Sequence, residues 1–266
     1  MSRATVCAVF SAKNVAEFVR PTLDSLAFCD EVIVVDMFST DKTREVCESY
    51  PNVKFFQRQD YIYGNFNYGL DQSTSEWIIR IDSDEVITQD LRESILEVLS
   101  NPNPEFNNYS AFCHLYYFGM RLHNAWGNKW RTMLFKKGTA RYAVQSEHED
   151  LTLTGPSGQL RGHYDHFTSP TIHDWISKSS YYMEKDVERL PLTAPMPPRK
   201  VLITMARRFR GAYWGKGKLK NDGYLGFVVA LWAACSLAIT QLMIWEKYEK
   251  ARLKAAGKFP DHPRAG

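Results

Sequence analysis

Short apolar runs alternate with helical patterns through the first hundred residues, and two of these runs end in an aspartate. The apolar runs occupy 5–10, 31–36, 53–57 and 76–82. Helical patterns fill the segments between them, at 16–26, 42–50, 66–73 and 88–99. Strands joined by helical crossovers form a parallel sheet that is covered on both faces. The sequence therefore predicts an α/β fold with Asp36 and Asp82 at the carboxyl edge of the sheet, where ligands bind in such folds.

The charge of the chain is unevenly distributed. Eight of its 33 basic residues lie in 199–220, a stretch without acidic residues, and the other 25 are outnumbered by 30 acidic residues. A general nucleic-acid-binding protein would spread its positive charge over the binding face. We therefore expect no nucleic-acid partner, but a mildly acidic domain that meets an anionic surface at one end. With 266 residues, 44% of them hydrophobic, the chain is also large enough to build a sizeable core.

The five cysteines are scattered and form no C-x-x-C pair. This arrangement indicates neither a disulfide framework nor a zinc site, and it favours a reducing compartment. The apolar run near the N-terminus passes directly into Lys13 and Asn14, so it is interpreted as a buried strand and not as a secretion signal. A cytoplasmic location is the resulting expectation.

The character of the chain changes after Pro104, where it becomes rich in aromatic residues and loops. A helical pattern covers 174–190, and the four prolines in 191–198 prevent it from continuing. The cationic stretch and an uncharged segment at 225–245 follow. The predicted organisation is one domain at 1–198, with halves at 1–104 and 105–198, and a helical extension at 199–266.

Two aspartates one residue apart, Asp82 and Asp84, follow the fourth apolar run and precede Glu85. Carboxylates in a loop that leaves a strand can face the same crevice, and their oxygens suit Mg²⁺ or Mn²⁺ that carries a diphosphate. An isolated D-x-D pattern is also typical of a solvated acidic turn. Its position at the end of a strand, beside a second strand that ends in Asp36, favours a functional site.

Several segments match patterns known from one enzyme family. Residues 34–43 (VVDMFSTDKT) fit V-D-x-x-S-x-D-x-T, residues 77–85 (WIIRIDSDE) fit W-h-h-x-h-D-A-D-E, where h is hydrophobic, and residues 66–70 fit N-x-(A/G)-L. Residues 133–138, 148–149 and 163–164 fit R-L-F-x-x-G, V-H-E and H-Y. The chain thus resembles the inverting family 2 glycosyltransferases, in the branch that adds glucose or a related sugar to the inner core of lipopolysaccharide.

The resemblance implies a GT-A fold, in which a mostly parallel central sheet is flanked by helices. Residues 1–104 would be the nucleotide-binding half and 105–198 the acceptor-binding half. The implied reaction transfers a hexose, with glucose expected, from a UDP-sugar. By this resemblance, Asp36 would hydrogen-bond to the base, Asp41 would support the nucleotide pocket, and Asn67 would lie at the border of that pocket. Asp82 would lie near the ribose and the metal, and Asp84 would bind the metal.

The proton acceptor and the remaining metal ligand are assigned from the later motifs. Inverting transfer needs a general base that takes the proton of the acceptor hydroxyl. By motif position this base is expected to be Glu149, with Asp150 as the residue behind it. A C-terminal histidine completes the metal site in many GT-A enzymes. His163 is assigned this role here, and His166 stays open as the alternative.

Two departures from the family pattern affect the donor pocket. Family members usually carry a glycine within the stretch that Met37 and Phe38 occupy, and a bulky Phe38 constrains this turn. Met133 stands at the arginine of R-L-F, and Arg131 is expected to replace that arginine in binding the nucleotide-sugar. Neither departure changes the carboxylates assigned to the metal.

The C-terminal extension mixes cations with apolar residues. The 21 uncharged residues at 225–245 are long enough to cross a bilayer as a helix. The cationic stretch before them suits a helix that lies on an anionic leaflet. We expect peripheral or monotopic association with the inner face of the cell membrane, where a lipid-linked or lipopolysaccharide-type acceptor would be found. A helical hairpin packed on the enzyme or on a second subunit is the alternative, and the oligomeric state is not predicted.

Two other functions compete with the glycosyltransferase. Residues 79–88 also resemble the first loop of haloacid-dehalogenase-like phosphatases, in which Asp82 would be the nucleophile. That fold needs a later acidic loop, which we do not find in the sequence. A non-catalytic sugar-nucleotide-binding membrane protein is the other alternative, and the intact carboxylates argue against it.

Overall fold

The computed structural model describes residues 3–124, 129–143, 151–215 and 218–258. The chain divides into two compact units. The sheet unit comprises Met1–Tyr116 and Gly127–Thr168, and the helical unit comprises Tyr117–Trp126 and Ser169–Gly266. Whereas the sequence predicts a boundary at 198, the compact helical unit also includes helix α5 (Ile172–Arg189).

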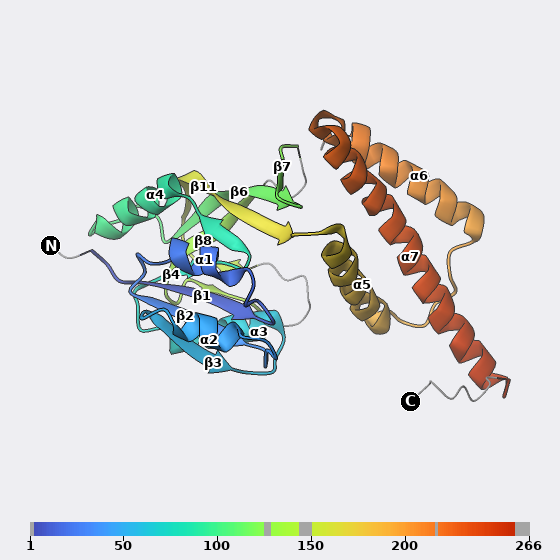
Figure 1. The fold of residues 1–266 in the computed structure, drawn as a ribbon, viewed down its shortest axis with the longest axis horizontal. Helices are drawn as coiled ribbons and strands as arrows, with labels where there is room; N and C mark the ends of the chain where they lie inside the picture. The colour runs from blue at the N-terminus through green and yellow to red at the C-terminus, as the bar shows by residue number, and fades with distance from the viewer. Residues whose placement is uncertain (1–2, 125–128, 144–150, 216–217, 259–266) are drawn as a thin grey trace. The chain divides into compact units, whose positions relative to one another are not determined.

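Four parallel strands form one half of the main sheet (Figure 1). Their order across the sheet is β3 (Val53–Gln57), β2 (Glu31–Asp36), β1 (Val6–Ala12) and β4 (Trp77–Arg80). Because β1 pairs in parallel with both β2 and β4, the carboxyl ends of these strands meet at one edge. The predicted α/β fold with a mostly parallel sheet is therefore confirmed.

Further strands continue the sheet beyond β4. Their order is β8 (Trp130–Lys136), β6 (Asn108–Tyr117), β11 (Ser157–Ser169) and β5 (Glu85–Ile87). Two short strands, β9 (Ala140–Arg141) and β10 (Thr152–Leu153), form a separate pair. Since β5 begins within the D-x-D-E segment, its pairing with β11 brings the residues around His163 and His166 to that segment.

Helices cover both faces of the sheet. Residues of β1 alternate between two apolar clusters, as the two-residue period of a strand requires. One cluster includes residues of α1 (Val19–Ser25), α2 (Thr43–Glu48) and α4 (Gln89–Ser100), and the other includes residues of α3 (Ile62–Gln72). Helix α3 packs so closely on β1 that a Cβ added to Gly69 would lie 2.4 Å from Cγ1 of Val9. The small residue of the N-x-(A/G)-L pattern is thus needed for helix packing.

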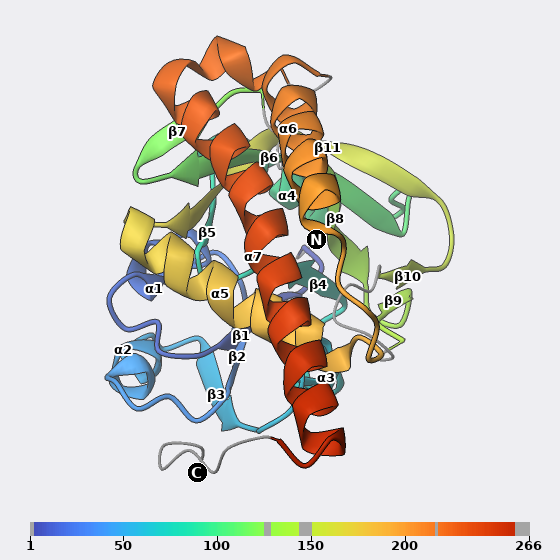
Figure 2. The ribbon, with the colours of Figure 1, turned by 90° about the vertical axis from the view of Figure 1, so that its right-hand side faces the viewer.

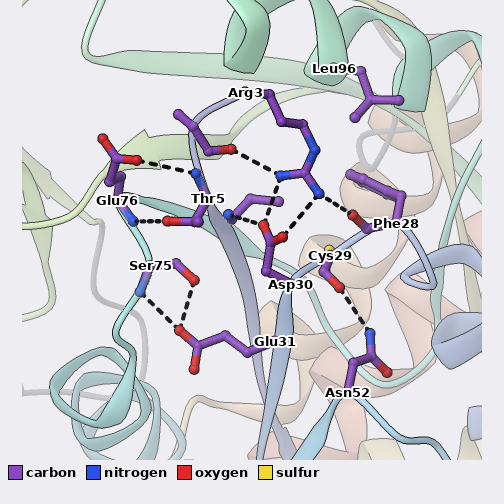
Figure 3. A network of polar contacts seen from close by, with 12 residues as sticks. Arg3, Thr5, Phe28, Cys29, Asp30, Glu31, Asn52, Ser75, Glu76 and Leu96 are labelled. Carbon is purple, nitrogen blue, oxygen red and sulfur yellow. Dashed lines mark hydrogen bonds and ion pairs between the residues drawn. The ribbon is translucent and has the colours of Figure 1, made fainter. Parts of the chain in front are cut away.

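The amino ends of the strands are joined by a polar network around Glu31 (Figure 3). This glutamate is 4% exposed, and Nζ of Lys54 lies 2.7 Å from its carboxylate. Further donors are the Ser73 hydroxyl, the Thr74 amide, and the amide and hydroxyl of Ser75, all at 2.7–2.9 Å. Burial alone would raise the pKa of Glu31, but these donors lower it to about 2. The network fixes the start of β2 against the loop that leads into β4.

The helical unit is built around one long helix. Its elements are β7 (Met120–Leu122), α5, α6 (Pro198–Trp214), η1 (Leu219–Asp222) and α7 (Gly223–Ala255). Helices α6 and α7 run side by side (Figure 2). Nζ of Lys247 on α7 donates hydrogen bonds to the carbonyls of Val187, Glu188 and Leu190 at 2.7–2.9 Å. A cation at the C-terminus of a helix satisfies its last carbonyls and complements its dipole, so Lys247 fastens α5 to α7.

By length and composition, the segment from η1 through α7 is able to cross a membrane. Only 17% of its most apolar window is buried within the structure, which differs from the core helix of a globular domain. Large apolar side chains are more than 40% exposed on α6 and α7, including Leu202, Trp214, Leu231, Leu242 and Trp245. The helical unit therefore presents apolar surface beside the cations of α6.

Candidate active site

Asp36 ends β2 at the carboxyl edge of the sheet, as predicted, and is 1% exposed. Its carboxylate accepts hydrogen bonds from the amide of Ser39 at 2.9 Å, from the Ser39 hydroxyl, and from Nε2 of Gln57 at 3.1 Å. These bonds fold the loop after β2 back onto the strand. Asp36 thus shapes the loop that is expected to hold the nucleotide base, while its bond to that base stays a prediction.

Asp41 braces the same loop from its other end. Its carboxylate accepts hydrogen bonds from the amide and hydroxyl of Thr43, at 3.0 and 2.5 Å, and from the amide of Ala16 at 3.1 Å. Burial alone would raise the pKa of Asp41, but these hydrogen bonds lower it. Asp41 therefore ties the start of α2 to the loop after β1, a position suited to the supporting role predicted for it.

Asn67 lies on α3 and is 6% exposed. Its Nδ2 donates to the carbonyl of Tyr142 at 2.9 Å, and its Oδ1 accepts from the amide of Tyr142 at 3.1 Å. The ring of Tyr142 stacks on that of Tyr63, with 4.2 Å between centroids, and the guanidinium of Arg80 lies 5.6 Å from its centroid. Asn67 thus positions an aromatic side chain beside β4.

Arg131 on β8 links two carboxylates of the D-x-D-E segment. Its Nη1 donates to Oδ2 of Asp82 at 3.1 Å, and its Nη2 donates to Oε2 of Glu85. The amide of Asp82 donates to the same oxygen of Glu85 at 2.9 Å. Burial alone would raise the pKa of Asp82, but the charges of Arg131, Arg80 and His166 lower it. The structure thus gives Arg131 a role within the carboxylate cluster, while its contact with the nucleotide-sugar stays a prediction.

Glu85 is fully buried in this cluster. Burial and the nearby charge of Asp82 raise the pKa of Glu85, although Arg131 opposes the rise. Its Oε1 is buried and has no hydrogen-bond partner among the residues that the structure describes. A buried carboxylate oxygen without a donor is costly, so Glu85 is the first sign that a further positive group belongs here.

His166 on β11 lies beside Asp84. Its Nε2 is 3.4 Å from Oδ1 of Asp84, and its Nδ1 is 3.7 Å from Oε1 of Glu85. The antiparallel register places His166 directly opposite Glu85. Burial alone would lower the pKa of His166, but Asp84, Cys113 and Glu85 raise it to about 10. A positive imidazolium therefore neutralises the converging carboxylates, and a metal ion that binds its Nε2 would displace the proton from that nitrogen.

The cluster fits a divalent cation. Carboxylate oxygens with one imidazole nitrogen form a donor set that suits Mn²⁺, and the oxygens alone suit Mg²⁺. The residues that would hold the cation are Asp84, Asp82 and His166. Oε1 of Glu85, which accepts no hydrogen bond from the described residues but lies 3.7 Å from Nδ1 of His166, adds negative charge beside them.

His163 lies on the opposite face of β11 from His166, because their positions in the strand differ by three, an odd number. Its Nε2 is 3.6 Å from Oδ1 of Asp165, and its ring centroid is 3.7 Å from that of His114. The structure therefore brings His166, and not His163, next to Asp84. Glu149 and Asp150, the residues predicted for proton transfer, lie outside the described residues.

The sequence-based site omits Glu85 and leaves His166 as an alternative. A signal for Glu85 exists in the strand pattern, since it alternates with Val86 and shares the buried face of Ile87. The proximity of His166 to Asp84 depends on the pairing of β11 with β5, in which the paired residues, from Tyr164↔Ile87 to His166↔Glu85, are far apart in the chain. No local pattern reveals such a register.

Comparisons with known proteins identify the family of the chain. The family model described as glycosyl transferase family 2 matches residues 7–152. The chain is 26% identical over 249 residues to the lipopolysaccharide core biosynthesis glycosyltransferase LpsC of Rhizobium meliloti. The aligned region covers 90% of this chain and 92% of LpsC. It is also 24% identical over 173 residues to an uncharacterized glycosyltransferase of Rickettsia prowazekii. The aligned region covers 60% of this chain and 59% of that protein.

Among solved structures, S. aureus TarS in complex with UDP-GlcNAc is 14% identical to this chain, with a TM-score of 0.49. The similarity covers 96% of this chain and 92% of the TarS chain. The family model spans more than half of the present sequence, including Asp36 at the end of β2 and the D-x-D-E segment after β4. This chain therefore belongs to glycosyl transferase family 2 and is a glycosyltransferase.

Proposed function

We propose that this glycosyltransferase moves a hexose, with glucose expected, from a UDP-sugar to a membrane-associated glycan such as a lipopolysaccharide-core acceptor. Family membership supports the sugar transfer. Similarity to LpsC over nine tenths of both chains supports an acceptor of the lipopolysaccharide-core type. The observation that carries the proposal is the convergence of Asp82, Asp84 and His166 at the carboxyl edge of the sheet.

These residues would hold Mg²⁺ or Mn²⁺ at the donor diphosphate. The bound cation would supply positive charge opposite the leaving group, on which negative charge develops as the bond to the sugar breaks. Arg131 keeps the Asp82 carboxylate in place through its guanidinium fork. Asp36 and Asp41 hold the neighbouring loops in the shape that the nucleotide would meet.

Proton transfer is assigned to the acceptor side. The acceptor oxygen forms its bond to the anomeric carbon while the bond to the UDP oxygen breaks, which inverts the configuration at that carbon. Glu149 would take the hydroxyl proton in this step, with Asp150 as the second candidate. Glu149→Gln is expected to lower kcat at least about 100-fold while donor binding persists, and Asp150→Asn is expected to have a smaller effect.

A donor and metal panel tests the proposal. The full chain is combined with UDP-, GDP- and dTDP-sugars in Mn²⁺, in Mg²⁺ or in a chelator, and its melting temperature and nucleotide release are measured. We expect stabilisation and turnover with UDP-glucose and metal only. Asp84→Asn should lower turnover about 100-fold or more with an unchanged melting temperature. Asp90→Asn, an exposed aspartate on α4, is the matched control and should keep full activity.

The same panel separates the alternatives. A haloacid-dehalogenase-like phosphatase would release phosphate from simple phosphate monoesters without any nucleotide-sugar. A non-catalytic binding protein would be stabilised by a donor but would release no nucleotide. The proposal fails if no nucleotide-sugar changes the melting temperature, or if Asp84→Asn turns over donor like the unaltered chain.

Membrane association is proposed for the helical unit. Exposed apolar side chains and the cations of α6 suit binding to the anionic inner leaflet, either by insertion of α7 or by its lying on the surface. We expect the chain to float with vesicles that contain anionic lipid, and binding to fall when Arg207 and Arg208 are both changed to Gln. Equal binding to neutral and anionic vesicles would contradict the electrostatic part of this proposal.

A further inference from the structure

A second cluster of metal-binding residue types lies on the face of β6 and β11 opposite His166. His163 and Asp165 are two residues apart on β11, so they share one face, and His114 on the neighbouring β6 joins them. Tyr164, Cys113 and Leu115, the neighbours of these residues in sequence, are buried in the core on the other side. The sheet therefore separates this cluster from the carboxylates around Asp84.

The three side chains point to a common centre. Oδ1 of Asp165 lies 3.7 Å from Nδ1 of His114 and 3.6 Å from Nε2 of His163. The three candidate ligand atoms lie within 4.8 Å of one another. N–H···O hydrogen bonds are shorter, at about 2.7–3.2 Å. Two ligands bound at about 2.0–2.2 Å to one tetrahedral ion lie about 3.3–3.6 Å apart. The distance from Asp165 to His163 falls at the upper end of this range, and the distance to His114, at 3.7 Å, lies just above it.

We propose that His114, His163 and Asp165 form a second metal site, selective for a transition-metal cation of the Zn²⁺ class. Two imidazoles and one carboxylate are typical Zn²⁺ ligands and leave a fourth position for water or a substrate oxygen. The site differs from that at Asp84, where carboxylates outnumber histidine and hard cations are favoured. This inference does not depend on the identity of the sugar donor.

The surroundings suit such an ion. The side chains of His114, Asp165 and His163 are 12, 20 and 31% exposed, so the site is partly shielded yet open to an entering ion. The ring of Phe112 lies edge-on to His114 at 5.7 Å, and the ring of Trp130 lies 5.5 Å from Phe112. Apolar neighbours lower the local dielectric and strengthen the attraction between a cation and its ligands.

Cobalt substitution tests the proposal on the untagged full chain. Co²⁺ bound by histidines in four-coordinate geometry absorbs strongly in the visible range, so titration with Co²⁺ reports this site without any catalytic assay. Zn²⁺ should then displace the Co²⁺ and abolish the absorption. We expect one equivalent of Co²⁺ to give this spectrum. His114→Gln, Asp165→Asn and His163→Asn should each remove it or weaken the Zn²⁺ affinity at least about tenfold.

Two controls separate this site from the donor site and from general histidine binding. Asp84→Asn should keep the cobalt spectrum, and so should His173→Gln, which changes an exposed histidine at the start of α5. Circular dichroism and the melting temperature of each variant show whether it is folded, and the more exposed His163 offers the variant with the smallest packing change. The proposal is overturned if no such spectrum forms, if a folded ligand variant keeps both the spectrum and the Zn²⁺ affinity of the unaltered chain, or if Asp84→Asn removes the spectrum.

Discussion

Glu31 lies at the edge of the sheet where the parallel strands begin, and Glu85 lies at the edge where they end. Both are buried, Glu31 being 4% and Glu85 0% exposed. Glu31 is surrounded by serine hydroxyls, backbone amides and a lysine, and its pKa falls to about 2. Glu85 has Arg131 and His166 as neighbours but also another carboxylate, that of Asp82, and its pKa rises. Similar burial thus produces opposite shifts.

The difference between the two edges follows from what each carboxylate faces. At the amino edge, one lysine and several neutral donors satisfy a single charge and hold the strands together, which is a structural task. At the carboxyl edge, several carboxylates are held close to one another by a few cations, and one of their oxygens has no donor among the described residues. Crowded like charges are costly for stability and are common at sites that bind a cation or a substrate.

The largest expected effect comes from removing the cation of each edge in turn. Arg131→Met leaves the buried Glu85 and the partly exposed Asp82 without their shared partner, and the unpaired charge of Glu85 should lower the free energy of unfolding by about 3–5 kcal/mol. Lys54→Met is the matched change at the amino edge. It should cost less than about 1 kcal/mol, because Lys54 is 47% exposed and Glu31 keeps its other donors. Urea unfolding measures the loss of unfolding free energy in both variants. Equal losses would contradict the proposed difference between the amino and carboxyl edges.

Glu31→Gln tests the amino edge directly. The amide group replaces an oxygen that accepts several hydrogen bonds, so at least one of the donors from Ser73 or Ser75 loses its acceptor. We expect a loss of about 2–3 kcal/mol in the free energy of unfolding. Donor turnover per folded molecule should not change, since this edge is remote from Asp84 along the strands. A selective loss of turnover would show that the amino edge also serves the reaction.

The pH dependence of stability should carry the signature of Glu31. Its pKa is about 2 in the folded chain and 4.5 as the ordinary value, so the folded state binds the proton more weakly. The resulting stabilisation is fully present above about pH 4.5 and disappears as the pH falls toward 2, with a total of about 3 kcal/mol. The difference in unfolding free energy between the unaltered chain and Glu31→Gln should be constant from pH 7 to 5 and shrink below it. A difference that grows on acidification would contradict this assignment.

The smallest expected effect concerns backbone strain at the carboxyl edge. Phe38 has φ of +55° in the loop after β2 and is 50% exposed. A left-handed conformation costs an ordinary residue about 1–2 kcal/mol, and glycine avoids this cost. Part of the resulting stabilisation is lost, because glycine has more conformational freedom in the unfolded chain than phenylalanine. Phe38→Gly should therefore stabilise the chain by about 0.5–1 kcal/mol in thermal unfolding. Met37→Gly is the control, because its φ is not positive, and it should destabilise by a similar amount.

Much of the sheet unit is predictable because its signals are local. Apolar runs of strand length, each followed by a helical pattern, identify β1 to β4, and the aspartates at two strand ends reach the expected edge. The boundaries are less well predicted. Helix α3 begins at Ile62, earlier than the predicted 66, and β4 ends at Arg80, so that Asp82 lies in the loop. The need for glycine near Phe38, expected from the family pattern, corresponds to an observed positive φ.

The sequence by itself determined the α/β order, the family and the carboxylates at Asp82 and Asp84, because each rests on neighbours along the chain. Only the tertiary structure decided which histidine meets Asp84. His163 and His166 must point to opposite faces of β11, but the pairing with β5 selects the face that carries the D-x-D-E carboxylates. It likewise decided that Arg131 binds Asp82 and Glu85, and that Asn67 binds the backbone of Tyr142. Such contacts join residues that are distant in sequence, and the packing of the whole sheet sets their register.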